Sequence, residues 1–186
     1  MIEVLITMLV VSLGLLGIAA MYIRSQQFAD EAYQRYQALD IAHQLAEQLS
    51  TNRTEAAKEA NSAYVTNPIT GTSLPGGSAF SPTSTCTGCD SVAMAGLDMT
   101  AFNNAITGAQ KVKGASQKIS ALVGALGCVE SLGVASSVTD PLRYRISVVW
   151  QGRQVSAAPI ETTGCGGNAL YGVGLRRVVS LEVQVL

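Results

Sequence analysis

The chain has 186 residues, a net charge of −1 and charged side chains at only 13% of its positions. This length is enough for one soluble domain with its own core beside one short additional segment. The near-neutral charge provides no basic face of the kind that gives general nucleic-acid binding, so nucleic acid is excluded as a general partner.

An apolar run dominates the N-terminus. No residue between Glu3 and Arg24 carries a charge. As a helix, the run Val4–Ile23 covers about 30 Å, which matches the hydrocarbon thickness of a bilayer. It follows an acid rather than a basic region and is longer than a signal-peptide core, so we expect a transmembrane helix rather than a cleaved signal. On the simplest interpretation, this transmembrane helix is an ordinary single-span anchor, and the Glu3 side chain snorkels to water.

The helical pattern continues beyond the apolar run. No proline interrupts it, and Gly14 and Gly17 are the only early glycines. We therefore predict one helix to about Ser50, with residues 1–23 in the membrane and residues 24–52 as an amphipathic half that packs on a domain. The small or apolar residues expected on the packed face are Ala32, Tyr36, Leu39, Ala42, Ala46 and Leu49.

Residues 53–124 are expected to form a loop-rich connecting region with short helices. Residues 66–90 are rich in proline, glycine, serine and threonine and have no periodicity, which predicts a loop. Farther along, one or two short helices are expected, with Asp98 as the N-cap of a helix over Met99–Thr107.

Residues 125–186 have the pattern of an antiparallel sheet. The segment Arg143–Trp150 is rich in β-branched and aromatic residues and alternates, and Gln151–Arg153 follows as a turn. The segment Leu175–Leu186 alternates again. Short connections favour antiparallel neighbours, so the fold class predicted is α+β, with a small sheet packed on the long helix. The alternation places Tyr144, Ile146, Val148 and Trp150 on one face of the first of these strands.

Four cysteines, Cys86, Cys89, Cys128 and Cys165, all follow the apolar run. An even number after an anchor or export segment favours two disulfides and an oxidising compartment. Three pairings are possible, and the short loop favours Cys86 with Cys89 and Cys128 with Cys165. The CxxC spacing also occurs in zinc and redox sites, but this loop lacks the strand-to-helix context of a thioredoxin-like motif and a second nearby ligand pair.

No catalytic constellation is found in the sequence. His43 is the only histidine and lies on the long helix, so Ser-His-Asp and Cys-His arrangements have little support. The glycine-rich segments 164–167 and 172–174 lack the Lys-Ser/Thr or βα context of phosphate-binding loops. We therefore predict a protein that is not an enzyme and has no catalytic residue, cofactor or metal.

The N-terminal sequence MIEVLITMLV resembles the start of the processed helix of type IV pilins, in which an apolar pair precedes a glutamate, here Glu3. The segments SLGLLG (12–17), AYQRYQA (32–38) and AHQLAEQLSTN (42–52) resemble minor pilins of the PilV type, also described as type IV pilus modification proteins. The strand ending VWQGR (149–153) is similar as well. The likeness covers the long helix well and the cysteine-bearing region loosely. The leader and glycine that precede such a helix are missing before Met1, so we expect a trimmed start or an internal methionine.

This resemblance implies a type IV pilin-like fold with a disulfide-bonded domain. It also implies a place in the bacterial inner membrane with a periplasmic domain, or in an extracellular pilus (fimbrium), and methylation. In such proteins the residue corresponding to Glu3 compensates the N-terminal amine of a neighbouring subunit. Gly14 and Gly17 would allow close helix packing or local melting.

The implied partners are other minor and major pilins, the inner membrane, the pilus assembly platform, and the prepilin peptidase for the full-length precursor. The implied function is non-catalytic: a minor pilin that primes or modifies the fibre during type IV pilus assembly. Two alternatives stay open. One is a minor pseudopilin of a type II secretion system, and the other is a membrane-tethered periplasmic thiol/disulfide protein using Cys86 and Cys89.

Overall fold

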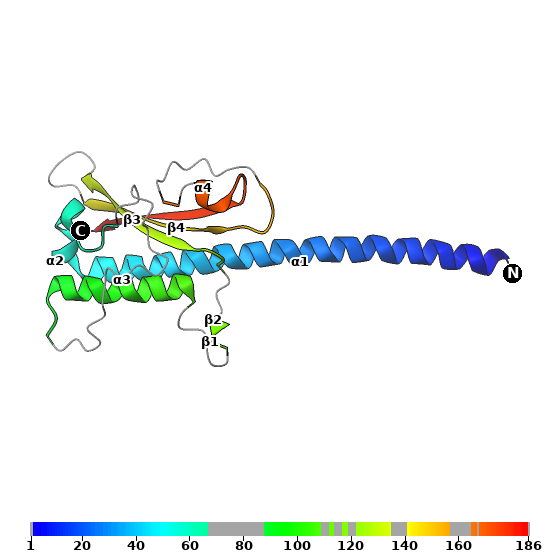
Figure 1. Cartoon of the computed structure of the whole chain (residues 1–186), viewed down its shortest axis with the longest axis horizontal. Helices are drawn as coiled ribbons and strands as arrows, with labels where there is room; N and C mark the ends of the chain where they lie inside the picture. Colours follow the sequence, from blue (N-terminus) through cyan, green and yellow to red (C-terminus); the bar gives the residue numbers. More distant parts are fainter. Residues whose placement is uncertain are drawn as a thin grey trace. The chain divides into compact units, whose positions relative to one another are not determined.

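A computed structural model describes residues 2–66, 88–108, 112–113, 117–118, 122–134, 141–156, 165–166 and 168–185 (Figure 1). The chain divides into two compact units, Met1–Arg35 and Tyr36–Leu186. The elements, in chain order, are α1 (Ile2–Thr51), α2 (Arg53–Ala56), the 3₁₀ helix η1 (Glu59–Asn61), α3 (Ser91–Thr107), β1 (Val112–Lys113), β2 (Gln117–Lys118), β3 (Leu126–Val134), β4 (Leu142–Gln151), α4 (Asn168–Tyr171) and β5 (Arg176–Val185).

The long helix predicted to about Ser50 is confirmed, because α1 runs without a break to Thr51. Its second half supplies the core of the Tyr36–Leu186 unit through residues that recur every three or four positions: Ala38, Ile41, Ala42, Leu45, Ala46 and Leu49. The predicted packed face is wrong at its beginning. Ala32 is exposed and Tyr36 is 70% exposed, because the buried line passes through Ala38 instead.

Three strands form the main sheet, in the order β3-β4-β5, and both pairs are antiparallel. The predicted α+β class is therefore confirmed. The central strand β4 is buried on both faces. The four residues predicted to share one face, Tyr144, Ile146, Val148 and Trp150, all lie in the core shared with the helices. Val149, between them, belongs to a second core on the opposite face. A strand that is paired on both edges and covered on both faces forms the centre of the domain.

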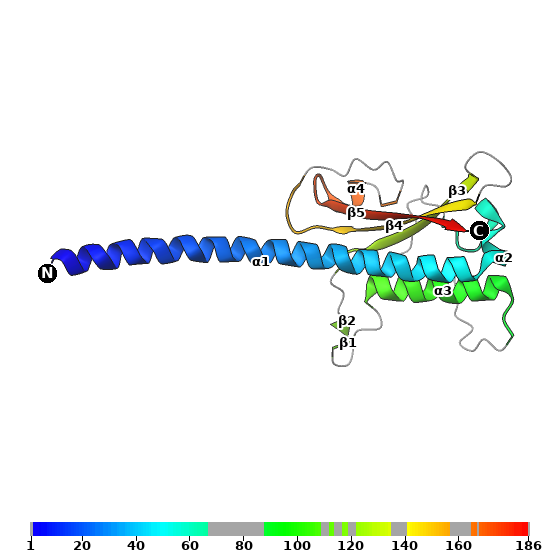
Figure 2. The same ribbon diagram turned by 180° about the vertical axis from the view of Figure 1, so that it is seen from behind.

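Helix α3 runs alongside the second half of α1 (Figures 1 and 2). Its buried residues, Ala95, Met99, Phe102 and Ile106, belong to the same core as those of α1. The contact with β3 is close at Gly127, where an added Cβ would collide with the side chains of Phe102 and Ile106. Glycine at this position allows the helix to approach the strand.

On the other face of the sheet, the Cys128–Cys165 disulfide joins β3 to the segment before α4. Both cysteines are fully buried, and their Cα atoms lie 5.8 Å apart. Tyr171, on α4, packs in the same small core and its hydroxyl donates a hydrogen bond of 2.7 Å to the carbonyl of Gly124. The disulfide therefore forms part of a second, smaller core that covers the face away from the helices.

Helix α3 differs from its prediction in length and in its cap. It is one helix that begins at Ser91, with Asp90 as N-cap accepting a 2.8 Å hydrogen bond from the Ala93 amide. The prediction of Asp98 as an N-cap is wrong, since Asp98 lies inside the helix. Asp90 was available eight positions earlier, directly after the loop, and satisfies the helix amides there. The short strands β1 and β2 pair with each other and were not predicted. The predicted loop falls mostly on residues 67–87, outside the described residues.

Candidate functional site

The first half of α1 presents an unusual amount of exposed apolar surface. It contains a window of mean hydropathy 2.5 that is entirely unburied, and by length and composition the helix can cross a membrane. Leu5 and Met8 are each 69% exposed, and Leu16 is 66% exposed. Water-soluble proteins rarely leave a contiguous apolar surface of this size uncovered. Lipid or another protein is the environment that this surface fits.

The polar side chains within this apolar half differ in how they are satisfied. The hydroxyls of Thr7 and Ser12 each donate a 2.9 Å hydrogen bond to a carbonyl of their own helix. Glu3 lies exposed in the first turn, where a negative charge interacts favourably with the helix dipole. Among the described residues its carboxylate has no ion-pair partner. It is therefore accessible to a cation from another molecule.

Gly14 and Gly17 are not required by contacts within the described chain. A Cβ added at either position would meet nothing within 4 Å. They lie about one turn apart on α1, where missing side chains leave the helix backbone accessible to a neighbouring helix. Packing and local melting at these glycines would therefore both depend on contacts with other molecules.

The cysteines are oxidised where the structure describes them. Cys128 and Cys165 form the bond favoured by the sequence, and Cys89 is also disulfide-bonded. The predicted partner of Cys89, Cys86, lies outside the described residues. Cys89 is exposed and stands just before α3, so the CxxC motif does adjoin a helix start. No thiol among the described cysteines is free.

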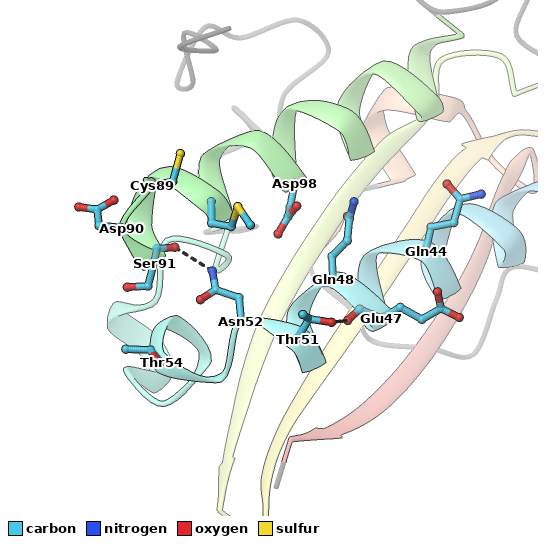
Figure 3. Close-up of a pocket in the computed structure, with 11 residues that line it drawn as sticks. Gln44, Glu47, Gln48, Thr51, Asn52, Thr54, Cys89, Asp90, Ser91 and Asp98 are labelled. Carbon is cyan, nitrogen blue, oxygen red and sulfur yellow. Dashed lines mark hydrogen bonds between the residues drawn. The ribbon is translucent and has the colours of Figure 1, made fainter. Parts of the chain in front are cut away.

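A polar groove that sequence reasoning missed lies where α1 ends and α3 begins (Figure 3). It has a volume of about 710 Å³. Across it, the side-chain amide of Asn52 donates to the carbonyl of Ser91 (2.7 Å) and to the hydroxyl of Tyr64 (3.2 Å). The available signal was polar residues at four-residue spacing on the last turns of α1. The lining residues are Gln44, Glu47, Gln48, Thr51, Asn52, Thr54, Cys89, Asp90, Ser91, Met94 and Asp98.

Beside this groove, Glu55 is a buried carboxylate with a full set of donors. Its side chain is 1% exposed and accepts hydrogen bonds from Lys58 Nζ (2.5 Å), the Ala63 amide (2.9 Å) and the Ser91 hydroxyl (3.1 Å). Burial acts to raise the pKa of Glu55, but these donors and the Lys58 charge outweigh it, so the pKa lies below its ordinary value. Glu55 thus joins α2, the following turn and α3.

Tyr64 completes this polar network. Its hydroxyl donates a 2.5 Å hydrogen bond to Asp98 in the middle of α3. Burial, together with the hydrogen bond to Asp98, raises the pKa of Tyr64 far above its ordinary value, so it stays a neutral donor. The polar side chains of Asn52, Tyr64 and Asp98 thus hydrogen-bond to one another. His43, on α1, is exposed. Within the described ranges, no group of three or more His, Cys, Asp or Glu side chains could hold a metal ion.

Comparison with known proteins does not identify the chain. No protein-family model matches it, and no curated protein or solved structure gives a significant match. What supports a function is therefore the chemistry of α1 and of the domain that its second half completes.

Proposed function

We propose that this chain is a minor pilin, resembling the PilV type, that takes part in the assembly of a type IV pilus by priming or modifying the fibre. It acts through subunit contacts and not through catalysis. It is anchored in the bacterial inner membrane with its domain in the periplasm, and it enters the fibre with other minor and major pilins.

The observation that carries this proposal is the dual use of one helix. The first half of α1 is apolar, exposed and long enough to cross a membrane, with Glu3 at its beginning. The second half provides core residues to an α+β domain with an antiparallel three-stranded sheet. A plain membrane anchor needs no such continuity, whereas a subunit transferred from lipid into a fibre needs an apolar helix firmly attached to its domain.

Glu3 is the proposed docking group. A carboxylate within an apolar environment is costly unless a cation compensates it, and opposite charges attract strongly where water is excluded. The proposed cation is the N-terminal amine of a neighbouring subunit. Gly14 and Gly17 would let a neighbouring helix approach closely, or would let α1 unwind locally during packing.

The test replaces Glu3 by Gln in the full-length precursor, produced in a piliated bacterium that lacks the native copy. Sheared pili and inner membranes are compared by immunoblot. If the ion pair contributes about 1.4 kcal/mol or more, the ratio of pilus-bound to membrane-bound protein falls about tenfold or more. The matched control is Ser12→Ala, which also removes a polar group from the apolar half, but one already satisfied by its own helix. Equal incorporation of Glu3→Gln and the unmodified protein would contradict the docking role.

The same strain separates the alternatives. Loss of protein secretion with intact piliation on deletion of the gene would indicate a pseudopilin of a type II secretion system instead. Titration of the native protein with a thiol reagent addresses the thiol/disulfide alternative. A reactive thiol at Cys86 or Cys89 would favour that alternative, and no accessible thiol is expected for the pilin.

A further inference from the structure

Four exposed aliphatic side chains gather on adjoining turns at one end of the three-stranded sheet. Val173 is 92% exposed, Val155 75%, Leu170 61% and Val123 55%. Single exposed apolar residues are common on soluble domains. Four on neighbouring turns form a surface that water solvates poorly. We refer to Val123, Val155, Leu170 and Val173 as the aliphatic tip.

Hydrogen bonds hold the turns of the aliphatic tip together. The Gln151 amide donates to the Val123 carbonyl (2.9 Å), and the Ser156 amide donates to the Gly174 carbonyl (2.9 Å). The hydroxyl of Tyr171, next to Leu170, donates to the carbonyl of Gly124. The tip is therefore a defined surface built on the end of the sheet.

Arginines are the charged residues in the described segments that form the tip, although one of them, Arg176, is buried and donates to the carbonyl of Cys165. Residues 122–125, 151–156 and 170–177 contain three arginines and neither aspartate nor glutamate. Arg153 is exposed. The guanidinium of Arg177 donates to the carbonyls of Gln154 (2.7 Å) and Gly174 (3.1 Å), so its charge is held against the turns. Aliphatic side chains beside arginines match the interface of a bilayer with anionic lipids.

The position of the tip within the Tyr36–Leu186 unit follows from the direction of β4. This strand begins beside α2, where the Tyr144 hydroxyl donates to the Ala56 carbonyl. It ends at Gln151, and both ribbon views show α4 and the turns after β4 at the end of the sheet remote from α2 (Figures 1 and 2). Because α1 ends next to α2, the tip lies at the opposite end of the unit, where α1 enters it.

The helical connection between the apolar run and the Tyr36–Leu186 unit is short. Between Ile23, the last residue of the apolar run, and Tyr36 there are about a dozen helical residues, or about 20 Å. The headgroup layer extends several ångströms beyond the hydrocarbon, and transmembrane helices tilt by about 20° on average. A domain that tilts toward its aliphatic tip can reach the headgroups.

We propose that the aliphatic tip contacts the anionic surface of the membrane that holds α1. Before assembly the domain would then lie on the bilayer with Val173 facing the lipid headgroups. The proposal depends on the membrane anchoring of α1 and not on its role in a pilus. Val155, Leu170 and Val173 would insert among the headgroups, and Arg153 would contact lipid phosphates. Entry into a fibre would then require release of the tip from the lipid.

The test uses the full chain reconstituted in vesicles of phosphatidylcholine and phosphatidylglycerol with brominated acyl chains, which quench indole fluorescence on contact. Val173→Trp places an indole at the tip. Ala60→Trp, an exposed position in η1 at the opposite end, is the matched control. The native Trp150 is 2% exposed within the core and gives the same background in both variants. Loss of fluorescence is expected for Val173→Trp relative to non-brominated vesicles, and none beyond background for Ala60→Trp.

Two further measurements complete the test. Arg153→Gln in the Val173→Trp background is expected to lower the ratio of lipid-bound to free tip about fivefold, the effect of one basic residue near an anionic surface, and only in vesicles that contain phosphatidylglycerol. The control is Arg53→Gln, an exposed arginine on α2. Leu170→Trp repeats the measurement if Val173→Trp does not fold.

Flotation of the chain with vesicles in alkaline carbonate reports the anchoring of α1 separately. A chain that floats but shows equal quenching at both positions overturns the tip contact alone. A tip that binds another protein instead of lipid would give this same result. A chain that does not float overturns the anchoring and the tip contact together.

Discussion

The hydroxyl of Tyr64 donates a 2.5 Å hydrogen bond to the carboxylate of Asp98 and thereby joins the chain after α1 to the middle of α3. Asn52, directly after α1, donates to the same hydroxyl. Tyr64 is fully buried. The end of the long helix is therefore fixed to its domain by polar contacts as well as by the apolar core.

Replacing Tyr64 by Phe is expected to lower the free energy of unfolding by about 1.5–3 kcal/mol, because a hydrogen bond to a charged acceptor is lost while the ring is kept. The detergent-solubilised chain, unfolded in urea and followed by the fluorescence of buried Trp150, provides the measurement. Tyr36→Phe is the control, since the Tyr36 side chain is 70% exposed. If both variants lose stability equally, the Tyr64 hydroxyl has no special role.

The lowered pKa of Glu55 predicts that the protein loses stability in acid. Its pKa in the folded protein lies below the ordinary value of 4.5. The stability that the ionised Glu55 side chain contributes is therefore fully present above pH 4.5. It is lost as the pH falls through the lowered pKa of the folded protein. We expect Glu55→Gln to unfold more easily than the unmodified chain at pH 7, by about 1–2 kcal/mol. The difference should shrink as the pH falls below 4.5 and through the lowered pKa of the folded protein.

Urea unfolding at a series of pH values checks this expectation. Glu47→Gln is the control, because the Glu47 side chain is exposed. A difference between Glu55→Gln and the unmodified chain that stays constant with pH would show that the Glu55 charge does not contribute.

The Cys128–Cys165 disulfide should be the more stabilising of the two predicted disulfides. The cysteines are 37 positions apart in sequence, and a loop of that length corresponds to about 4 kcal/mol in the chain-entropy description. Replacing both cysteines by Ser is expected to shift the urea midpoint strongly downward. The comparison is Cys86→Ser/Cys89→Ser, whose predicted disulfide would close a far shorter loop. A larger shift for the CxxC pair would reverse this order.

Leucine at Gly14 and Gly17 is expected to lower the amount of the chain in sheared pili, because the added side chains would keep a neighbouring helix at a distance. The unfolding midpoint reported by Trp150 should not change, since a Cβ added at either glycine would meet nothing within 4 Å and both lie outside the Tyr36–Leu186 unit. Ala19→Leu, another small residue exposed on the apolar half, is the control. Normal incorporation of the Gly14→Leu/Gly17→Leu variant would argue against close helix packing there.

Local patterns predicted α1, β4 and β5 well, whereas the start of α3 was misplaced and β1, β2 and β3 were not located. The apolar run and the absence of proline specified α1 to within one residue of its end, and alternation located β4 and β5. The packed face of α1 was less accessible, because Tyr36 and Ala38 both fit a helical stripe and only the position of the sheet and of α3 decides which one is buried.

The polar features depended on distant contacts. Asp98 resembled a helix start because aspartate is a favoured N-cap residue. Its actual partner, Tyr64, is too far away in sequence to be recognised from a local pattern. The hydrogen bonds of Glu55 join residues up to 36 positions apart. A local sequence pattern therefore could not predict them. The aliphatic tip likewise arises only when the turns after β4, α4 and the start of β3 are brought together by the sheet.

The burial pattern of α1 has a consequence for limited proteolysis. Helical residues that contribute to the domain core begin at Ala38, whereas Arg35 is exposed and the compact unit begins at Tyr36. Trypsin cleavage after Arg35 would therefore leave the released fragment with every core residue that α1 supplies. Such a fragment would lose the membrane-length segment and keep its disulfide, and it would be a natural starting material for crystallisation of the domain.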